Sequence, residues 1–304
     1  MSTVNIGSVS SVFRSRTLFH AAAQSMGCPP TPYSMANCWR RFRPWNDSLS
    51  LWKRLRCGRG VNKSNRALMF NHFPQLLSLY DNPLWFVISH HEWVTEWDEL
   101  AESIRVGGKP LDAYNGKLTR LLHGRVDWPC LAVHLVLLRT QGARFEFHRM
   151  WLKQNFAAML GLSCIQRPIA DIRTELQDFL IPTLFGTNLA SQAGRQYWPS
   201  CWAANETLFK FLQGRQWLRG DDQQLALLIW NFRQQLLREL DVGPPKSMGA
   251  TGCGLPRSLQ KKWCRQQARW SDHPVHLNGV CCEFIDQHAS TAVSRDSQAT
   301  SPRA

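Results

Sequence analysis

Acidic residues are almost missing from the first 68 positions, where Asp47 stands alone against eleven Lys and Arg residues. The whole chain of 304 residues carries a formal charge of +14, from 36 basic and 22 acidic residues. Residues 69–243 hold 17 of each sign, and residues 244–304 hold eight basic and four acidic residues. The positive charge therefore belongs to the two flanks, and an anionic partner is expected there.

Long hydrophobic runs are also missing. The best charge-free apolar run, Trp128 to Leu138, is shorter than the roughly 18 residues that a membrane span needs, and no continuous apolar segment near the start fits a secretory signal. We therefore expect no membrane span and a cytoplasmic location. The acid-free, Ser-rich residues 1–30 leave an organellar transit peptide as an alternative, and Met69 is an alternative natural start.

The sequence lacks the motifs of the common catalytic and nucleotide-binding sites. It has no Gly-x-Ser-x-Gly, no phosphate-binding loop ending in Gly-Lys-Ser/Thr and no Gly-x-Gly-x-x-Gly. The zinc-protease pattern needs a second His four residues after the first, where His90 and His91 are followed by Val94 and Thr95. We predict no catalytic residues, metal or cofactor. The alternative is a helical enzyme whose site is built from His90, His91, Glu92, Glu96 or His148.

Cysteine placement does not suggest a disulfide framework. Of the ten cysteines, only Cys130, Cys164 and Cys201 lie in the balanced block, within apolar helical patterns typical of buried free thiols. The C-terminal flank holds residue types that bind zinc, but its one well-spaced pair has a proline inside it. We interpret these residues as incidental, with a zinc site as the alternative: Cys253, Cys264, His273, His276, Cys281 and Cys282.

Helix signals follow one another closely from Met69 onward. The clearest begins at Asp221 and Asp222, which supply an N-cap and negative charge at the positive end of a helix dipole. Apolar residues then recur at helical spacing until Gly243-Pro244-Pro245 ends the pattern. Other helices are predicted over about 73–80, 83–105, 112–122, 130–138, 143–160, 168–180 and 199–214, and no segment shows strand alternation.

These patterns predict an all-α fold, an irregular multi-helix bundle of about eight helices with poorly ordered basic N- and C-terminal flanks. Residues 69–243 form the globular domain in this interpretation. Residues 1–68 are expected to be a basic extension largely outside the core. Residues 244–304 are expected to be a basic, mostly disordered tail with one helix at about 257–271.

The basic N-terminal flank is the best candidate for a binding site. Its cationic side chains would neutralise phosphates, and the neighbouring rings of Trp39, Phe42, Trp45 and Trp52 would stack on unpaired bases. The predicted contact is with nucleic acid, driven by phosphate and without sequence preference. The cationic residues are Arg40, Arg41, Arg43, Lys53, Arg54, Arg56 and Arg59.

A second candidate site is a groove for a protein partner. Tryptophan is favoured at protein interfaces, and Trp198, Trp202 and Trp217 flank a region rich in loops. The leading hypothesis is thus a non-enzymatic helical interaction or adaptor protein whose basic arm contacts nucleic acid. The alternative is a protein–protein module of a larger assembly in which the flanks are dispensable.

Overall fold

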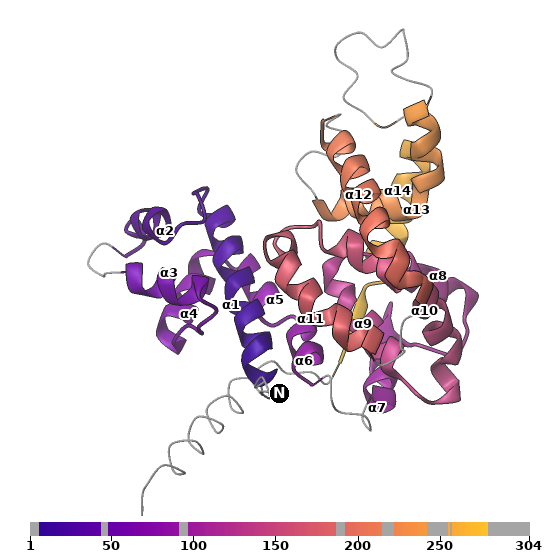
Figure 1. Cartoon of the computed structure of the whole chain (residues 1–304), viewed down its shortest axis with the longest axis horizontal. Coiled ribbons are helices and arrows are strands. Elements are labelled where there is room, and N and C mark those ends of the chain that lie inside the picture. Colours follow the sequence, from indigo (N-terminus) through magenta and orange to yellow (C-terminus); the bar gives the residue numbers. More distant parts are fainter. Residues whose placement is uncertain are drawn as a thin grey trace, which may run out of the picture. The chain divides into compact units, whose positions relative to one another are not determined.

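The structure is a computed structural model, which describes residues 6–43, 48–90, 97–186, 192–214, 222–241, 255 and 257–278 (Figure 1). The chain divides into two compact units. The first consists of Met1–Trp93 with Val280–Ala304, and the second consists of Val94–Gly279. The all-α prediction is confirmed, because helices make up nearly all of the described secondary structure in both units.

The first unit is entirely helical over its described residues. Helix α1 packs against α3, α5 and α6, while α2 packs against α3 and α4 against α5. These helices run in indigo to violet in Figure 1. Their bounds are α1 (Ile6–Ser25), α2 (Pro32–Trp39), α3 (Leu49–Arg56), α4 (Lys63–His72), α5 (Gln75–Tyr80) and α6 (Pro83–Ser89).

Two tryptophans form the centre of this unit. Trp39 at the end of α2 is 1% exposed, and Trp52 on α3 is fully buried. Their rings meet edge to face with centroids 5.5 Å apart, and Phe19 of α1 lies 6.5 Å from the Trp52 ring. Aromatic side chains bury large apolar areas and favour such edge-on contacts, so these three residues join α1, α2 and α3 into one core.

Helix α3 shows how the sequence divides between core and surface. Leu51, Trp52 and Leu55 face inward, whereas Lys53 and Arg56 are exposed on the other side. Leu55 lies four residues after Leu51 and three after Trp52, spacings that place side chains on one side of a helix, so this eight-residue segment is amphipathic.

The loop after α3 lies directly on α1. Gly58 has a positive φ of 80°, and a Cβ atom built there would stand 2.6 Å from Cγ1 of Val12. Only glycine combines that backbone conformation with so close an approach.

The first unit differs from the predicted extension over residues 1–68. Residues 6–43 and 48–68 contribute α1 to α3 and most of α4, and the compact unit ends at Trp93. High charge and Ser content concealed the core, because α1 buries Ser10, Arg14, Ser15 and Thr17 beside its apolar residues. A helix that buries polar side chains lacks the apolar periodicity by which helices are recognised.

The second unit is also mostly helical. All nine residues of α9 are buried, and α10 packs against α9, α12 and α13. The helices are α7 (Trp97–Glu102), α8 (Gly116–His123), α9 (Leu131–Arg139), α10 (Glu146–Ser163), α11 (Arg173–Gly186), α12 (Gln192–Gly214), α13 (Asp222–Asp241) and α14 (Arg257–Asp272), with short 3-10 turns η1 (Trp128–Cys130), η2 (Ala143–Phe145) and η3 (Ile169–Ile172).

A small antiparallel sheet belongs to the second unit, in the order β2-β1-β3. Its strands are β1 (Ile104–Val106), β2 (Lys109–Pro110) and β3 (Val275–Leu277), and Arg105 pairs with both Pro110 and His276. Gly107 and Gly108 have φ values of 60° and 75° and form a two-residue hairpin turn.

The interpretation of residues 83–105 as one helix ending at Gly107-Gly108 is therefore wrong. The segment contains α6, α7 and β1, with residues 91–96 outside the description. The absence of strand alternation did not exclude a sheet, because strands of two or three residues are too short to show it.

Two other predictions concern the C-terminal flank and the membrane. The predicted helix at about 257–271 is α14, and Leu259, Trp263 and Trp270 are buried on it.

Among the described residues, no single helix is both long and apolar enough to cross a membrane. Within the described parts of the chain, one pair of helical segments, α8 and Trp128–Arg139, reaches the length and apolar composition of a membrane span when the two are taken together. This pair is bent by 117°.

Candidate nucleic-acid interface

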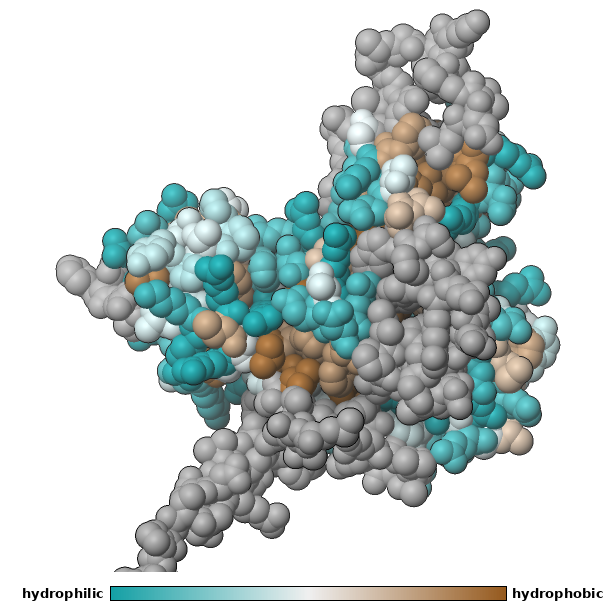
Figure 2. All heavy atoms as spheres, in the orientation of Figure 1, coloured by the Kyte–Doolittle hydropathy of each residue, from teal (hydrophilic) through white to brown (hydrophobic). Residues whose placement is uncertain are grey.

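The described residues of the first unit include a single acidic side chain to balance their cations. Its described residues, 6–43 and 48–90, include eleven Lys and Arg residues and one acidic residue, Asp81. Five further acidic residues and two arginines of this unit lie outside the described residues: Asp47, Glu92, Glu283, Asp286, Asp296, Arg295 and Arg303. On the side of the molecule in Figure 2, the surface over α2, α3 and α4 is mostly hydrophilic. Uncompensated charge of one sign gives this unit a positive potential.

The predicted cationic residues lie on α3 or just beyond the ends of α2 and α3, two helices that pack together. Lys53, Arg54 and Arg56 lie on α3, Arg40, Arg41 and Arg43 follow α2, and Arg59 follows α3. Six of the seven are exposed, and Arg43 is half-buried. We call this surface the basic face, defined by Arg40, Arg41, Arg43, Lys53, Arg54, Arg56 and Arg59.

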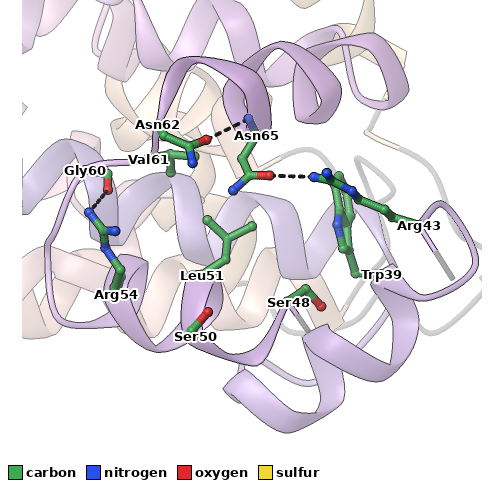
Figure 3. Close-up of a pocket in the computed structure, with 10 residues that line it drawn as sticks. All are labelled: Trp39, Arg43, Ser48, Ser50, Leu51, Arg54, Gly60, Val61, Asn62 and Asn65. Carbon is green, nitrogen blue, oxygen red and sulfur yellow. Dashed lines mark hydrogen bonds between the residues drawn. The ribbon is translucent and has the colours of Figure 1, made fainter. Parts of the chain in front are cut away.

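Internal bonds hold only part of the basic face. Nη1 of Arg43 donates a hydrogen bond of 2.8 Å to Oδ1 of Asn65, and Nη2 of Arg54 donates one of 3.4 Å to the Gly60 carbonyl (Figure 3). The other five cations of the face form no ion pair with any described residue: Arg40, Arg41, Lys53, Arg56 and Arg59. Their charge is available to an external anion.

Two arginines that point into the first unit lie against the same aromatic ring. The guanidinium carbons of Arg14 and Arg66 lie 4.3 and 5.1 Å from the centroid of the Tyr80 ring. Arg66 also donates a 2.7 Å hydrogen bond to the Tyr80 hydroxyl. The electron-rich face of an aromatic ring attracts a cation, so these contacts help to accommodate the inward-facing charge.

The predicted stacking role is wrong for Trp39 and Trp52, because both rings are buried in the core. Trp45 lies outside the described residues. The exposed rings near the basic face are Tyr33, which is 66% exposed, and Phe42, which is 36% exposed. Nζ of Lys53 lies 5.7 Å from the centroid of the Tyr33 ring, so a cation and an exposed ring are side by side. Tyr33 escaped the sequence analysis because it lies outside the basic clusters.

A pocket of about 270 Å³ opens within the basic face. Figure 3 shows its walls, which come from the end of α2, the first turns of α3 and the segment that leads into α4. Polar and cationic groups predominate in the lining, which consists of Trp39, Arg43, Ser48, Ser50, Leu51, Arg54, Gly60, Val61, Asn62 and Asn65.

A buried histidine cluster in the second unit contains one residue of the predicted His/Glu site. Nε2 of His148 lies 3.1 Å from the Asp112 carbonyl, so this nitrogen carries the proton. Nδ1 of His148 then accepts a 3.2 Å hydrogen bond from Nε2 of His123. His134 donates from Nε2 to the Leu122 carbonyl at 3.4 Å.

Burial keeps these rings neutral. It is the main cause that lowers the pKa of His123 to about 3, with His148 and His134 nearby as further causes, and it lowers the pKa of His134 to about 4. The pKa of His148 is lowered too, chiefly by burial. The His123 ring also stacks on Trp151 at 3.8 Å. The hydrogen bonds and ring contacts of these three histidines indicate a structural role in the packing of the second unit.

Of the other residues of the predicted His/Glu site, the structure describes only His90. His90 of the His/Glu site lies in the first unit, with its Nδ1 2.9 Å from the Phe86 carbonyl, while His91, Glu92 and Glu96 lie outside the described residues. Within the described parts of the chain, no three His, Cys, Asp or Glu residues are grouped to hold a metal ion.

The structure describes only some of the residues predicted for a zinc site and for a partner groove. Cys264 is exposed on α14, and His276 lies on β3, whereas three zinc candidates lie outside the described residues: Cys253, Cys281 and Cys282. Trp198 and Trp202 belong to the part of α12 whose side chains are not described, and Trp217 is outside the described residues.

The basic face and its pocket are therefore the site that the described residues support best. Comparison of the chain with models of protein families, with curated proteins and with solved structures gives no match.

Proposed function

We propose that this protein is a non-enzymatic, cytoplasmic nucleic-acid-binding protein that contacts phosphates through the basic face. One observation carries the proposal: eleven Lys and Arg residues and a single acidic residue occur in residues 6–43 and 48–90. Cationic side chains that bind phosphates release condensed counterions, and this release drives binding without regard to sequence.

The exposed rings favour unpaired nucleic acid over duplex. Tyr33 and Phe42 present accessible aromatic surface beside the cations. A base can stack on such a ring only when it is not held in a duplex, and every base has a face that stacks. We therefore expect single strands to bind more tightly than duplexes of the same length.

The test compares two variants that lose the same charge. The first replaces four arginines outside the pocket: Arg40→Gln, Arg41→Gln, Arg56→Gln and Arg59→Gln. The matched control replaces four exposed cations of α14: Arg257→Gln, Lys261→Gln, Lys262→Gln and Arg265→Gln. Fluorescence anisotropy with a labelled single-stranded oligonucleotide measures affinity for both, and circular dichroism checks that both remain helical.

We expect the variant in the basic face to lose at least about tenfold in affinity and the α14 variant to lose little, because only the first removes phosphate contacts. Equal losses would show that overall charge matters and not this surface. Retained nucleic-acid binding in the first variant would overturn the proposal. Capture of a protein partner that persists in that variant would favour the alternative, a protein–protein module in which the flank is dispensable.

A further inference from the structure

The cations of the pocket stand apart from each other. In Figure 3, Arg43 and Arg54 lie at opposite ends of the pocket, and Leu51 lies between them. Arg43 is fixed by Asn65 and Arg54 by the Gly60 carbonyl, so each guanidinium is positioned while it keeps further N–H donors. A single phosphate calls for cations that converge, whereas this pocket offers two separate cationic positions.

The middle of the pocket is uncharged and offers hydrogen-bond donors. Oδ1 of Asn62 accepts a 2.8 Å hydrogen bond from the backbone N–H of Asn65, and Oδ1 of Asn65 accepts from Arg43. The engaged oxygens fix both amides, so their NH₂ groups are left to donate. Leu51, at 8% exposure, adds an apolar surface between the two ends.

This arrangement matches the chemistry of one nucleotide unit in a strand. A nucleotide within a strand has a phosphate on either side of an uncharged sugar and base. We infer that the pocket binds one unpaired nucleotide, with its flanking phosphates on Arg43 and Arg54 and its sugar and base over Leu51. The amide NH₂ groups donate to oxygen or nitrogen acceptors of the sugar or base. The inference rests on the proposed function and assigns it a specific subsite.

The size of the pocket also fits a single nucleotide. Its volume of about 270 Å³ lies just below the usual range for sites that enclose a small molecule, about 300–1,000 Å³. It can take a single nucleotide, and a base that enters it cannot remain paired in a duplex.

A nucleoside 3′,5′-bisphosphate is the matching probe, since it has a phosphate on each side of one nucleoside. Isothermal titration calorimetry with the full chain compares it with the nucleoside 5′-monophosphate, and we expect the bisphosphate to bind at least about tenfold more tightly. Arg43→Gln and Arg54→Gln should each reduce its affinity to that of the monophosphate. Arg265→Gln removes the same charge from an exposed position of α14 in the second unit and should leave the affinity unchanged.

Ser50→Glu provides a second variant, because Ser50 is an exposed lining residue whose replacement adds a negative charge without removing a core contact. It should abolish bisphosphate binding even if Arg43→Gln disturbs the fold. Oligonucleotide binding without bisphosphate binding, or equal effects of Arg54→Gln and Arg265→Gln, would overturn the nucleotide pocket and leave the proposed function intact. Failure of oligonucleotides to bind would overturn the proposed function itself.

Discussion

Arg43 and Asn65 are 22 positions apart in the sequence, and a hydrogen bond of 2.8 Å joins the guanidinium of one to the amide oxygen of the other. This bond connects the segment after α2 to helix α4. It also holds a half-buried cation at one end of the pocket, where the described residues of the unit include a single acidic residue, Asp81. The bond therefore orients a positive charge without neutralising it.

Asn65→Asp tests this relationship with a nearly isosteric change. A carboxylate in this position would form an ion pair with Arg43 and repel phosphate, so we expect affinity for a single-stranded oligonucleotide to fall roughly fivefold. The free energy of unfolding should not decrease. The measurement is a pair of anisotropy and urea titrations.

Asn115→Asp is the control for that change. Asn115 caps α8 in the second unit, where its Oδ1 accepts from the backbone N–H groups of Lys117 and Leu118. Aspartate caps a helix as well as asparagine does, so stability should be kept. Because this variant adds the same charge far along the chain from the basic face, an equal loss of affinity would contradict the role of Arg43.

Tyr33→Ala tests whether an exposed ring stacks on bases. Base stacking on an aromatic side chain contributes about 1–3 kcal/mol, so affinity for a single strand should fall at least about fivefold. The Tyr33 ring is 66% exposed, so unfolding should change little. Tyr114→Ala is closely matched, at 65% exposure in the second unit, and should not alter binding. Comparable losses in the two variants would rule out a specific stacking role.

Gly58→Ala should destabilise the first unit. Alanine at a φ of 80° is strained, and its Cβ would stand 2.6 Å from Cγ1 of Val12 on α1. The combined cost is about 2 kcal/mol or more. Urea unfolding followed by tryptophan fluorescence measures it. Gly60→Ala, where no atom lies within 4 Å of the added Cβ, should change the unfolding free energy by far less.

The histidine cluster predicts that the second unit loses stability as the pH falls. In the unfolded chain these rings have pKa values near 6.5, whereas in the fold those of His123 and His134 are about 3 and 4. Between these values the unfolded state binds more protons. The stabilisation is therefore fully present above about pH 6.5 and is lost as the pH falls toward the folded pKa values.

Chemical denaturation at several pH values between these limits checks that dependence. His134→Gln keeps an N–H donor for the Leu122 carbonyl and removes one titrating group. This variant should reduce the slope of unfolding free energy against pH by the contribution of about one proton, which is about 1.4 kcal/mol per pH unit. A stability that does not vary over this range would contradict the burial of neutral rings.

Local signals in the sequence predicted the helices with clear ends. Asp222 begins α13 as its capping pattern indicated, and α14 runs from Arg257 to Asp272, one residue beyond the predicted helix. The hairpin at Gly107-Gly108 was missed because β1 and β2 are so short. Its third strand, β3, lies about 170 positions away, and no local pattern encodes such a pairing.

The candidate site was only partly predictable for a similar reason. The cationic residues were identified by charge, and six of the seven are exposed in the structure. Charge alone did not reveal that Leu51, Trp52 and Leu55 give α3 a buried face, or that Trp39 packs on Trp52. The pocket depends on contacts between α2, α3 and the start of α4, and tertiary packing determines these contacts.

The salt dependence of binding by the unaltered protein is the most direct test of the central claim, that the basic face binds the phosphates of nucleic acid. Affinity for a labelled single strand is measured by anisotropy from about 50 to about 200 mM salt. Seven cationic side chains, at about 0.7 counterions each, set an upper limit near −5 for the slope of log affinity against log salt. We predict a slope between about −2 and −5. No binding at the lowest salt, or a slope near zero, would contradict the claim.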